Sequence, residues 1–293
     1  MDYTNAIEIN QIKKVYDGFT LGALSFTVPK GCVMGFVGQN GAGKSTTIKA
    51  ILNVIKPNSG DIKVLGFDSV TEEKQYKDDI AVVFDSLPFH EGLNARKVDR
   101  ILKSIYKKWN SEVFFHYLKR FNLPEKKKLG DFSKGMKMKF QIATALSHDA
   151  KLLIMDEATS GLDPVVRSEM LDVFMEYMQD EEHTILMSSH ITSDLEKIAD
   201  CVTFIHNGQL LLSGYKDEIL ENHGIIQCEE AYIKEIDEAD IVSIRRNDFG
   251  ASVMIKNRTQ TGSKYAGAVV DSASLDDILL FYVRGLTGRE WRI

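Results

Sequence analysis

The sequence lacks long hydrophobic runs, paired cysteines and an excess of positive charge. No apolar run approaches the ~20 residues that a membrane-spanning helix needs, and the opening Met1-Asp2-Tyr3 does not resemble a signal peptide, so we expect work at a membrane to require a partner. The three cysteines, at positions 32, 201 and 228, form no C-x-x-C motif, which predicts free thiols in a reducing compartment. The net charge of −6 disfavours extended contact with a nucleic acid backbone, and we expect no nucleic acid partner.

What the chain does have is an ordinary globular composition. With 293 residues, 44% of them hydrophobic and 27% charged, it is long enough for a substantial core and for two domains. The motifs described below end near residue 220. We therefore expect one domain over residues 1–220 and a C-terminal accessory or regulatory extension over residues 221–293.

The most informative stretch is residues 38–46, which read GQNGAGKST. A short apolar segment, residues 33–37, precedes it and predicts a buried parallel strand, and helically spaced isoleucines follow it. A glycine-rich turn between a strand and a helix is the context that the phosphate-binding motif G-x-x-x-x-G-K-[ST] requires. Backbone N–H groups and the helix N-terminus would face a polyphosphate, Lys44 would add a point charge, and the Ser45 hydroxyl would bind Mg²⁺.

A second group of polar residues follows two buried strands. Residues 152–155 form a continuous apolar segment that ends in Asp156 and Glu157, at the edge of a parallel sheet where ligands bind. Asp156 is placed to hold Mg²⁺, and Glu157 to orient or deprotonate an attacking water. The strand predicted over residues 184–187 ends close to His190, which could reach a γ-phosphate.

The remaining patterns predict three accessory regions. Alternating strands over residues 6–15 and 21–28 indicate an antiparallel sheet, the first of them as an edge strand, and residues 90–150 read as an inserted helical subdomain. The basic triplet at residues 126–128 is typical of a solvated loop. After residue 220, three short strands and a final helix capped by Ser274 predict a small α+β fold.

The ordered motifs over residues 3–220 resemble the ATP-binding subunit of an ABC transporter. Tyr16 matches the A-loop aromatic, and His190 matches the switch histidine. Residues 38–46 match the Walker A motif, and residues 152–157 match the Walker B motif. The signature loop corresponds to residues 132–136, and the D-loop to residues 160–163. The resemblance implies a P-loop NTPase (RecA-like) α/β core with an antiparallel β subdomain and an inserted helical subdomain. It also implies ATP and Mg²⁺ as cofactors and ATP hydrolysis coupled to transport.

The resemblance assigns site residues. The catalytic residues would be Lys44, Glu157 and His190, and the metal ligands Ser45, Asp85 and Asp156. The residues that bind ATP would be Tyr16, Gly38, Asn40, Gly41, Ala42, Gly43, Lys44, Ser45, Thr46, Ser133, Lys134 and Gly135.

Two positions depart from the commonest pattern of the family. Asp85 stands where the Q-loop glutamine is expected, and the signature reads Phe-Ser-Lys-Gly-Met instead of L-S-G-G-Q. Ser133 and Gly135 are kept, and Lys134 adds a positive charge that favours phosphate contact. Both departures resemble those of bacterial exporter subunits for antimicrobial or cytolytic peptides, of the lantibiotic, bacitracin and phenol-soluble-modulin type.

The family implies a second copy of the chain, or a paralogue, that completes an ATP sandwich. It also implies a separate integral membrane permease, to which the protein would bind peripherally at the cytoplasmic face of the membrane. The apolar residues 87–93 could receive that permease or pack internally. The alternatives are a soluble ABC-type ATPase of translation or DNA repair, and a nucleotide-binding regulator without turnover.

Overall fold

The computed structural model describes residues 3–247, 250–265 and 268–285. Its contacts divide the chain into two compact units, Met1–Leu210 and Leu211–Ile293. The boundary after residue 220, placed where the sequence motifs end, stays a prediction.

The first unit contains a six-stranded sheet whose strands, apart from β10 at one edge, are short and mostly buried. Its order is β10-β9-β3-β8-β7-β6, and the pairs among β3, β6, β7, β8 and β9 are parallel. These strands are β3 (Val33–Val37), β6 (Ile80–Val83), β7 (Leu152–Asp156), β8 (Thr184–Ser189), β9 (Cys201–His206) and β10 (Gln209–Tyr215). Burial on both faces explains the uninterrupted apolar runs of the inner strands β3 and β7, whereas β10 at the edge of the sheet is only partly covered.

An antiparallel sheet accompanies this core. Its order is β2-β1-β4-β5, with β1 (Asn5–Tyr16), β2 (Phe19–Pro29), β4 (Ser59–Val64) and β5 (Phe67–Asp68). The antiparallel subdomain is thus confirmed, but the prediction of an edge strand near residues 6–15 is wrong. Ile9 lies opposite Phe26 on one side and Ile62 on the other, so β1 is an inner strand and its apolar side chains join the core.

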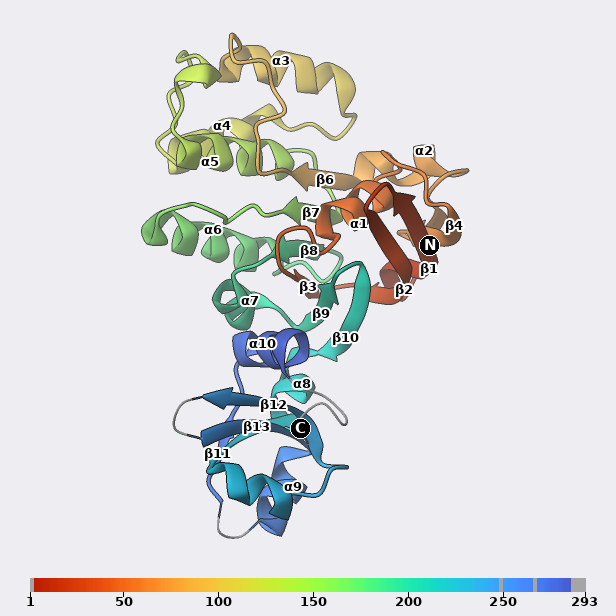
Figure 1. Ribbon diagram of the computed structural model, residues 1–293. Helices are drawn as coiled ribbons and strands as arrows, with labels where there is room; N and C mark the ends of the chain where they lie inside the picture. Colours follow the sequence, from red (N-terminus) through yellow and green to blue (C-terminus); the bar gives the residue numbers. More distant parts are fainter. Residues whose placement is uncertain (1–2, 248–249, 266–267, 286–293) are drawn as a thin grey trace. The chain divides into compact units, whose positions relative to one another are not determined.

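Helices connect the parallel strands. Helix α1 (Lys44–Ile51) follows β3, while α6 (Pro164–Tyr177) and α7 (Thr192–Ile198) flank β8 in the chain, and the short α2 (Glu73–Tyr76) and η1 (Lys77–Asp79) precede β6. The helical insertion between β6 and β7 is confirmed and gathers at the top of the view (Figure 1). It comprises α3 (Ala95–Ile105), α4 (Ser111–Arg120), η2 (Leu129–Asp131) and α5 (Lys134–Ala145).

The second unit is a small α+β fold, as predicted. Its antiparallel sheet has four strands in the order β12-β13-β11-β14, whereas the sequence predicts three. The additional strand is the buried β11 (His223–Cys228), which follows α8 (Lys216–Asn222) without a break. The other elements are η3 (Glu230–Glu235), β12 (Ile241–Asn247), β13 (Gly250–Lys256), α9 (Arg258–Lys264), β14 (Val270–Ser272) and α10 (Leu275–Arg284). The predicted capping box of α10 is present between Ser274 and Asp277.

Candidate functional site

The loop between β3 and α1 forms a cradle that only small residues can build. Gly43 has φ +113°, and a Cβ atom on it would lie 2.8 Å from Leu21 Cδ1. A Cβ atom on Gly38 would lie 2.5 Å from the carbonyl oxygen of Ile205. The backbone can therefore bend tightly here and press against β9 only because both positions are glycine.

A cavity of about 410 Å³ opens on this cradle. The first turn of α1 begins at Lys44 and holds no acidic side chain, and no side chain caps its N-terminus. The free N–H groups at that end fit an anion such as a polyphosphate. The cavity is lined by Phe19, Asn40, Gly41, Gly43, Lys44, Ser45, Thr46 and Glu157.

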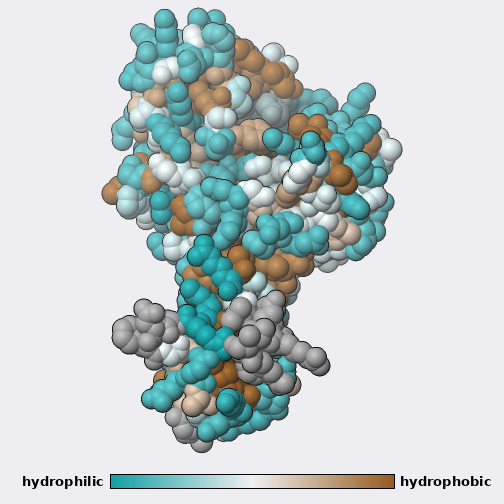
Figure 2. All heavy atoms as spheres, in the orientation of Figure 1, coloured by the Kyte–Doolittle hydropathy of each residue, from teal (hydrophilic) through white to brown (hydrophobic). Residues whose placement is uncertain are grey.

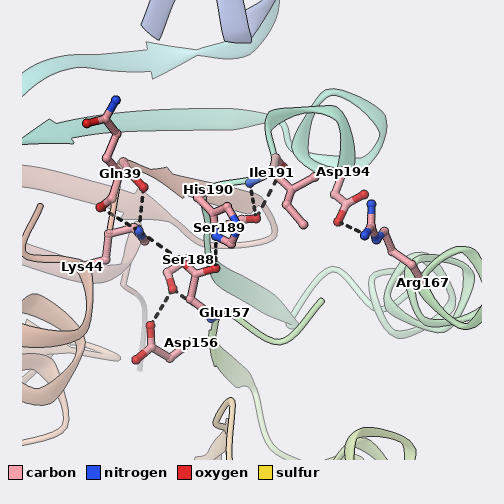
Figure 3. Close-up of polar contacts among 11 residues, drawn as sticks. Gln39, Lys44, Asp156, Glu157, Arg167, Ser188, Ser189, His190, Ile191 and Asp194 are labelled. Carbon is pink, nitrogen blue, oxygen red and sulfur yellow. Dashed lines mark hydrogen bonds and ion pairs between the residues drawn. The ribbon is translucent and has the colours of Figure 1, made fainter. Parts of the chain in front are cut away.

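Lys44 is the buried cation of this cavity, with only 5% of its side chain exposed. Its Nζ atom donates to the carbonyl oxygens of Gly38, at 2.6 Å, and Gln39, at 3.2 Å. It also lies 2.9 Å from Oε1 of Glu157 (Figure 3). The lysine thus neutralises the carboxylate that the sequence predicts as catalytic.

Glu157 is held in an uncommon backbone conformation, with φ +55°. Its N–H group lies 3.1 Å from Ser188 Oγ and 3.2 Å from the Ser188 carbonyl oxygen. Its Oε2 atom lies 2.6 Å from Nδ1 of His190. Because a carboxylate only accepts hydrogen bonds, this contact places a proton on Nδ1 of the histidine.

Ser188 is a site residue that the sequence analysis missed. Its hydroxyl donates to Oδ1 of Asp156 at 2.7 Å while its oxygen faces the Glu157 N–H group. Asp156 and Ser188 lie opposite each other in the β7–β8 register, so strand pairing fixes this bridge. Figure 3 shows Asp156, Glu157, Ser188 and His190 together beside Lys44.

The three predicted metal ligands lie in different surroundings. Ser45 lines the cavity, Asp156 ends β7, and Asp85 is exposed two residues beyond the end of β6. In the described part of the chain, no group of three or more His, Cys, Asp or Glu side chains could hold a metal ion. Mg²⁺ needs only one or two protein ligands when phosphates and waters complete its shell, so Ser45 and Asp156 fit such an ion.

Gln141, also missed, fixes the chain just before Asp85. Its side chain accepts from the N–H group of Phe84 at 3.2 Å and donates to the Phe84 carbonyl oxygen at 3.0 Å. Gln141 is buried in α5, the helix that begins at Lys134. These two hydrogen bonds therefore connect the end of β6 to α5, the helix that follows the predicted signature loop.

Six predicted ATP-binding residues are not among those that line the cavity of a single chain. Gly38 and Ala42 belong to the cradle loop itself, and the other four are Tyr16, Ser133, Lys134 and Gly135. The Tyr16 side chain is 42% exposed at the end of β1, whereas Phe19 at the start of β2 lies against the cradle. Ser133 caps α5 by accepting from the Met136 N–H group, and the neighbouring Lys134 is exposed. Residues 133–135 thus remain available to another molecule.

Comparison with known proteins agrees with this geometry. The family described as ABC transporter matches residues 21–160. The ABC transporter ATP-binding protein NatA of Bacillus subtilis (strain 168) is 33% identical over 205 residues, which cover 68% of this chain and 83% of the relative. The bacitracin transport ATP-binding protein BcrA of Bacillus licheniformis is 36% identical over 211 residues, 70% of this chain and 68% of the relative.

A solved structure is similar as well. The ATP-binding subunit of an ABC transporter superposes with a TM-score of 0.67 at 28% identity and covers 73% of this chain and 91% of its own. These matches confirm the P-loop NTPase fold and disfavour the alternative of a translation or repair ATPase. Proteins of this kind bind nucleotide, hydrolyse ATP in step with transport, dimerise and work with transmembrane permeases. The chain belongs to the ATP-binding subunits of ABC transporters.

Proposed function

We propose that this chain binds ATP with Mg²⁺ in the cavity between β3 and α1, and that hydrolysis there drives a separate transmembrane subunit. The observation that carries the proposal is a series of contacts: Lys44 and Glu157 line the cavity and contact each other, and His190 contacts Glu157. A cation, a general base and a residue that holds the base are thereby adjacent.

Each residue has a distinct part in this proposal. Lys44 exchanges its contact with Glu157 for the β/γ-phosphates, because a polyphosphate offers more negative charge than one carboxylate. Glu157, released from Lys44, accepts a proton from the attacking water while His190 holds its other oxygen. Ser45, Asp156 and Asp85 would hold Mg²⁺, which when bound would neutralise charge on the phosphate oxygens.

The partner that completes the site is a second copy of the chain or a paralogue. Ser133, Lys134 and Gly135 lie at the N-terminus of α5, outside the cavity of their own chain. In the ATP sandwich that we propose, this helix end and Lys134 close on the γ-phosphate held by the partner's cradle. Tyr16 stacks on the adenine ring in the same arrangement.

We further propose that the transported molecule is a peptide or another antimicrobial compound that the cell exports. The relative BcrA is named for bacitracin transport, and Lys134 and Asp85 agree with the sequence pattern that resembles such exporters. No helix in the described residues is long and apolar enough to cross a membrane. The proposal places the chain at the cytoplasmic face of the membrane, bound to a permease.

Sedimentation of a hydrolysis-deficient variant tests the sandwich. Glu157→Gln should form dimers with ATP and Mg²⁺ but not with ADP, because only the γ-phosphate reaches both surfaces. Adding Ser133→Arg should keep the protein monomeric, whereas the exposed Ser104→Arg on α3 serves as the matched control and should not. If the Ser133→Arg double variant still dimerises with ATP, the proposed contact is wrong.

A further inference from the structure

The helical insertion carries a charge opposite to that of the whole chain. Residues 94–128 contain eleven lysines and arginines against three aspartates and glutamates, a formal charge of +8, although the chain as a whole carries −6. All eleven basic side chains are exposed. Such a local excess creates a field that attracts an anionic surface.

Most of these cations have no anionic partner. Arg96, Lys107, Lys108 and Arg120 make ion pairs with acidic residues. Within the described ranges no ion pair or side-chain hydrogen bond occupies the remaining seven, which form the free charge of this surface. They are Lys97, Arg100, Lys103, Lys119, Lys126, Lys127 and Lys128.

Two large apolar side chains stand among these cations. Ile101 is 42% exposed and Ile105 60% exposed, and both lie on α3 one helical turn apart. Ala95, Val98 and Leu102 already supply the buried stripe of that helix. The isoleucines therefore add apolar area beyond what packing needs, and Figure 2 shows hydrophobic patches among hydrophilic surface over α3 at the top of the view.

A groove continues this surface from α3 to the loop after α4. It has a volume of about 880 Å³ and an apolar floor to which Phe115 and Pro124 contribute. Its lining also holds four basic residues, Arg96, Lys119, Lys126 and Lys127, against two acidic ones, Glu112 and Glu125, of which Glu125 pairs with Arg96. The groove therefore combines apolar lining with unpaired positive charge, as the outer side of α3 does.

We propose that this cationic face, made of α3, the end of α4 and residues 124–128, contacts an anionic phospholipid surface directly. Diffuse lysine charge suits headgroups that can move beneath it, and exposed isoleucines on a basic helix suit shallow insertion at the interface. An acidic peptide or a nucleic acid would use the charge but would leave Ile101 and Ile105 without a role. The inference goes beyond the proposed function, because none of these residues lines the nucleotide cavity.

Co-sedimentation of the full chain with vesicles tests the proposal. Vesicles of phosphatidylcholine with phosphatidylglycerol should bind the protein, phosphatidylcholine alone should not, and added salt should weaken binding. Replacing Lys126, Lys127 and Lys128 by Gln should lower binding about 100-fold, since each lysine near an anionic membrane adds roughly a fivefold increase in binding. The matched control replaces three exposed lysines outside the helical insertion, Lys13, Lys56 and Lys74, by Gln. This control should change vesicle binding little.

A second variant, Ile101→Ser with Ile105→Ser, separates insertion from charge attraction alone. It should weaken binding to anionic vesicles while leaving the salt dependence in place. Three outcomes would overturn the proposal: equal binding to neutral vesicles, equal loss in both lysine variants, or binding to duplex DNA but not to vesicles. ATP hydrolysis by each variant shows that the protein is folded and keeps failure here distinct from failure of the proposed function.

Discussion

Replacing Glu157 by Gln should separate ATP binding from ATP hydrolysis and should make binding tighter. The change keeps the shape of a side chain that lies 2.9 Å from Lys44 Nζ and 2.6 Å from His190 Nδ1, but it removes the negative charge. Without nucleotide, Lys44 loses its ionic partner. With nucleotide, the phosphates lose a carboxylate that repels them. Both effects favour the bound state.

The size of the effect follows from these distances. A unit-charge pair about 4 Å apart is worth about 4 kcal/mol at an effective dielectric constant of 20. The Glu157 side chain keeps some contact with solvent, and counterions screen its charge further, so a net gain of about 1.4 kcal/mol is realistic. That gain is a roughly tenfold lower Kd for ATP. Loss of the general base should lower kcat by about 1,000-fold.

Two assays measure these outcomes. Titration with a fluorescent ATP analogue gives the affinity, and phosphate release gives the turnover. Glu169→Gln is the matched control, because it removes a carboxylate paired with a lysine, Lys139, outside the cavity, and it should leave both values near those of the parent. Wild-type turnover in Glu157→Gln would refute the role of base, and unchanged or weaker ATP binding would refute the exchange of Lys44 between carboxylate and phosphate.

Three further changes test other parts of the structure. Gly43→Ala should weaken ATP binding more than tenfold, because φ +113° and the 2.8 Å approach to Leu21 Cδ1 exclude a Cβ atom. A nucleotide titration measures the affinity, and a near-normal Kd would contradict this prediction. Arg167→Ala should lower the free energy of unfolding by about 2 kcal/mol in urea, because it strips the 2% exposed Asp194 of its ion pair, and Asp194→Asn in that background should restore part of the loss. Burial lowers the pKa of His148 below its ordinary value of 6.5, so the unfolded chain takes up the proton first. The free energy of unfolding should therefore fall as pH drops below about 6.5, less steeply in His148→Gln, and the same pH dependence in both proteins would argue against this.

Local patterns predicted the parts of the fold that depend on neighbouring residues. The tight turn at Asn207 and Gly208 has φ +47° and +73°, as the turn chemistry requires, and Pro164 begins α6 directly after its cap, Asp163. The place of β1 inside its sheet could not be predicted in this way. It depends on pairing with β4, some fifty residues away, and nothing in the alternation of β1 specifies how many neighbours it has.

The same distinction holds for the candidate site. Lys44, Glu157 and His190 were identified because each stands in a recognisable local motif, and the structure brings them into contact. Ser188 carries no such signal, because its bridge to Asp156 exists only after β7 and β8 pair. Gln141 could have been found as a polar residue on the apolar face of a helix, since such a side chain needs a partner when it is buried.

Strand register ultimately places the chemistry. Asp156 pairs with Ser188 across β7 and β8, and Val37 pairs with Ser189 across β3 and β8. The residues that follow these strands, including the cradle, Glu157 and His190, therefore emerge at one edge of the sheet. A slip of one residue would turn the Ser188 hydroxyl to the opposite face and break its bridge to Asp156. Strands buried on both faces specify register poorly through hydrophobicity alone. Polar contacts at the strand starts, such as the Asp200 carboxylate accepting from the Val33 N–H group at 2.8 Å, are thus as important to the site as the residues that line it.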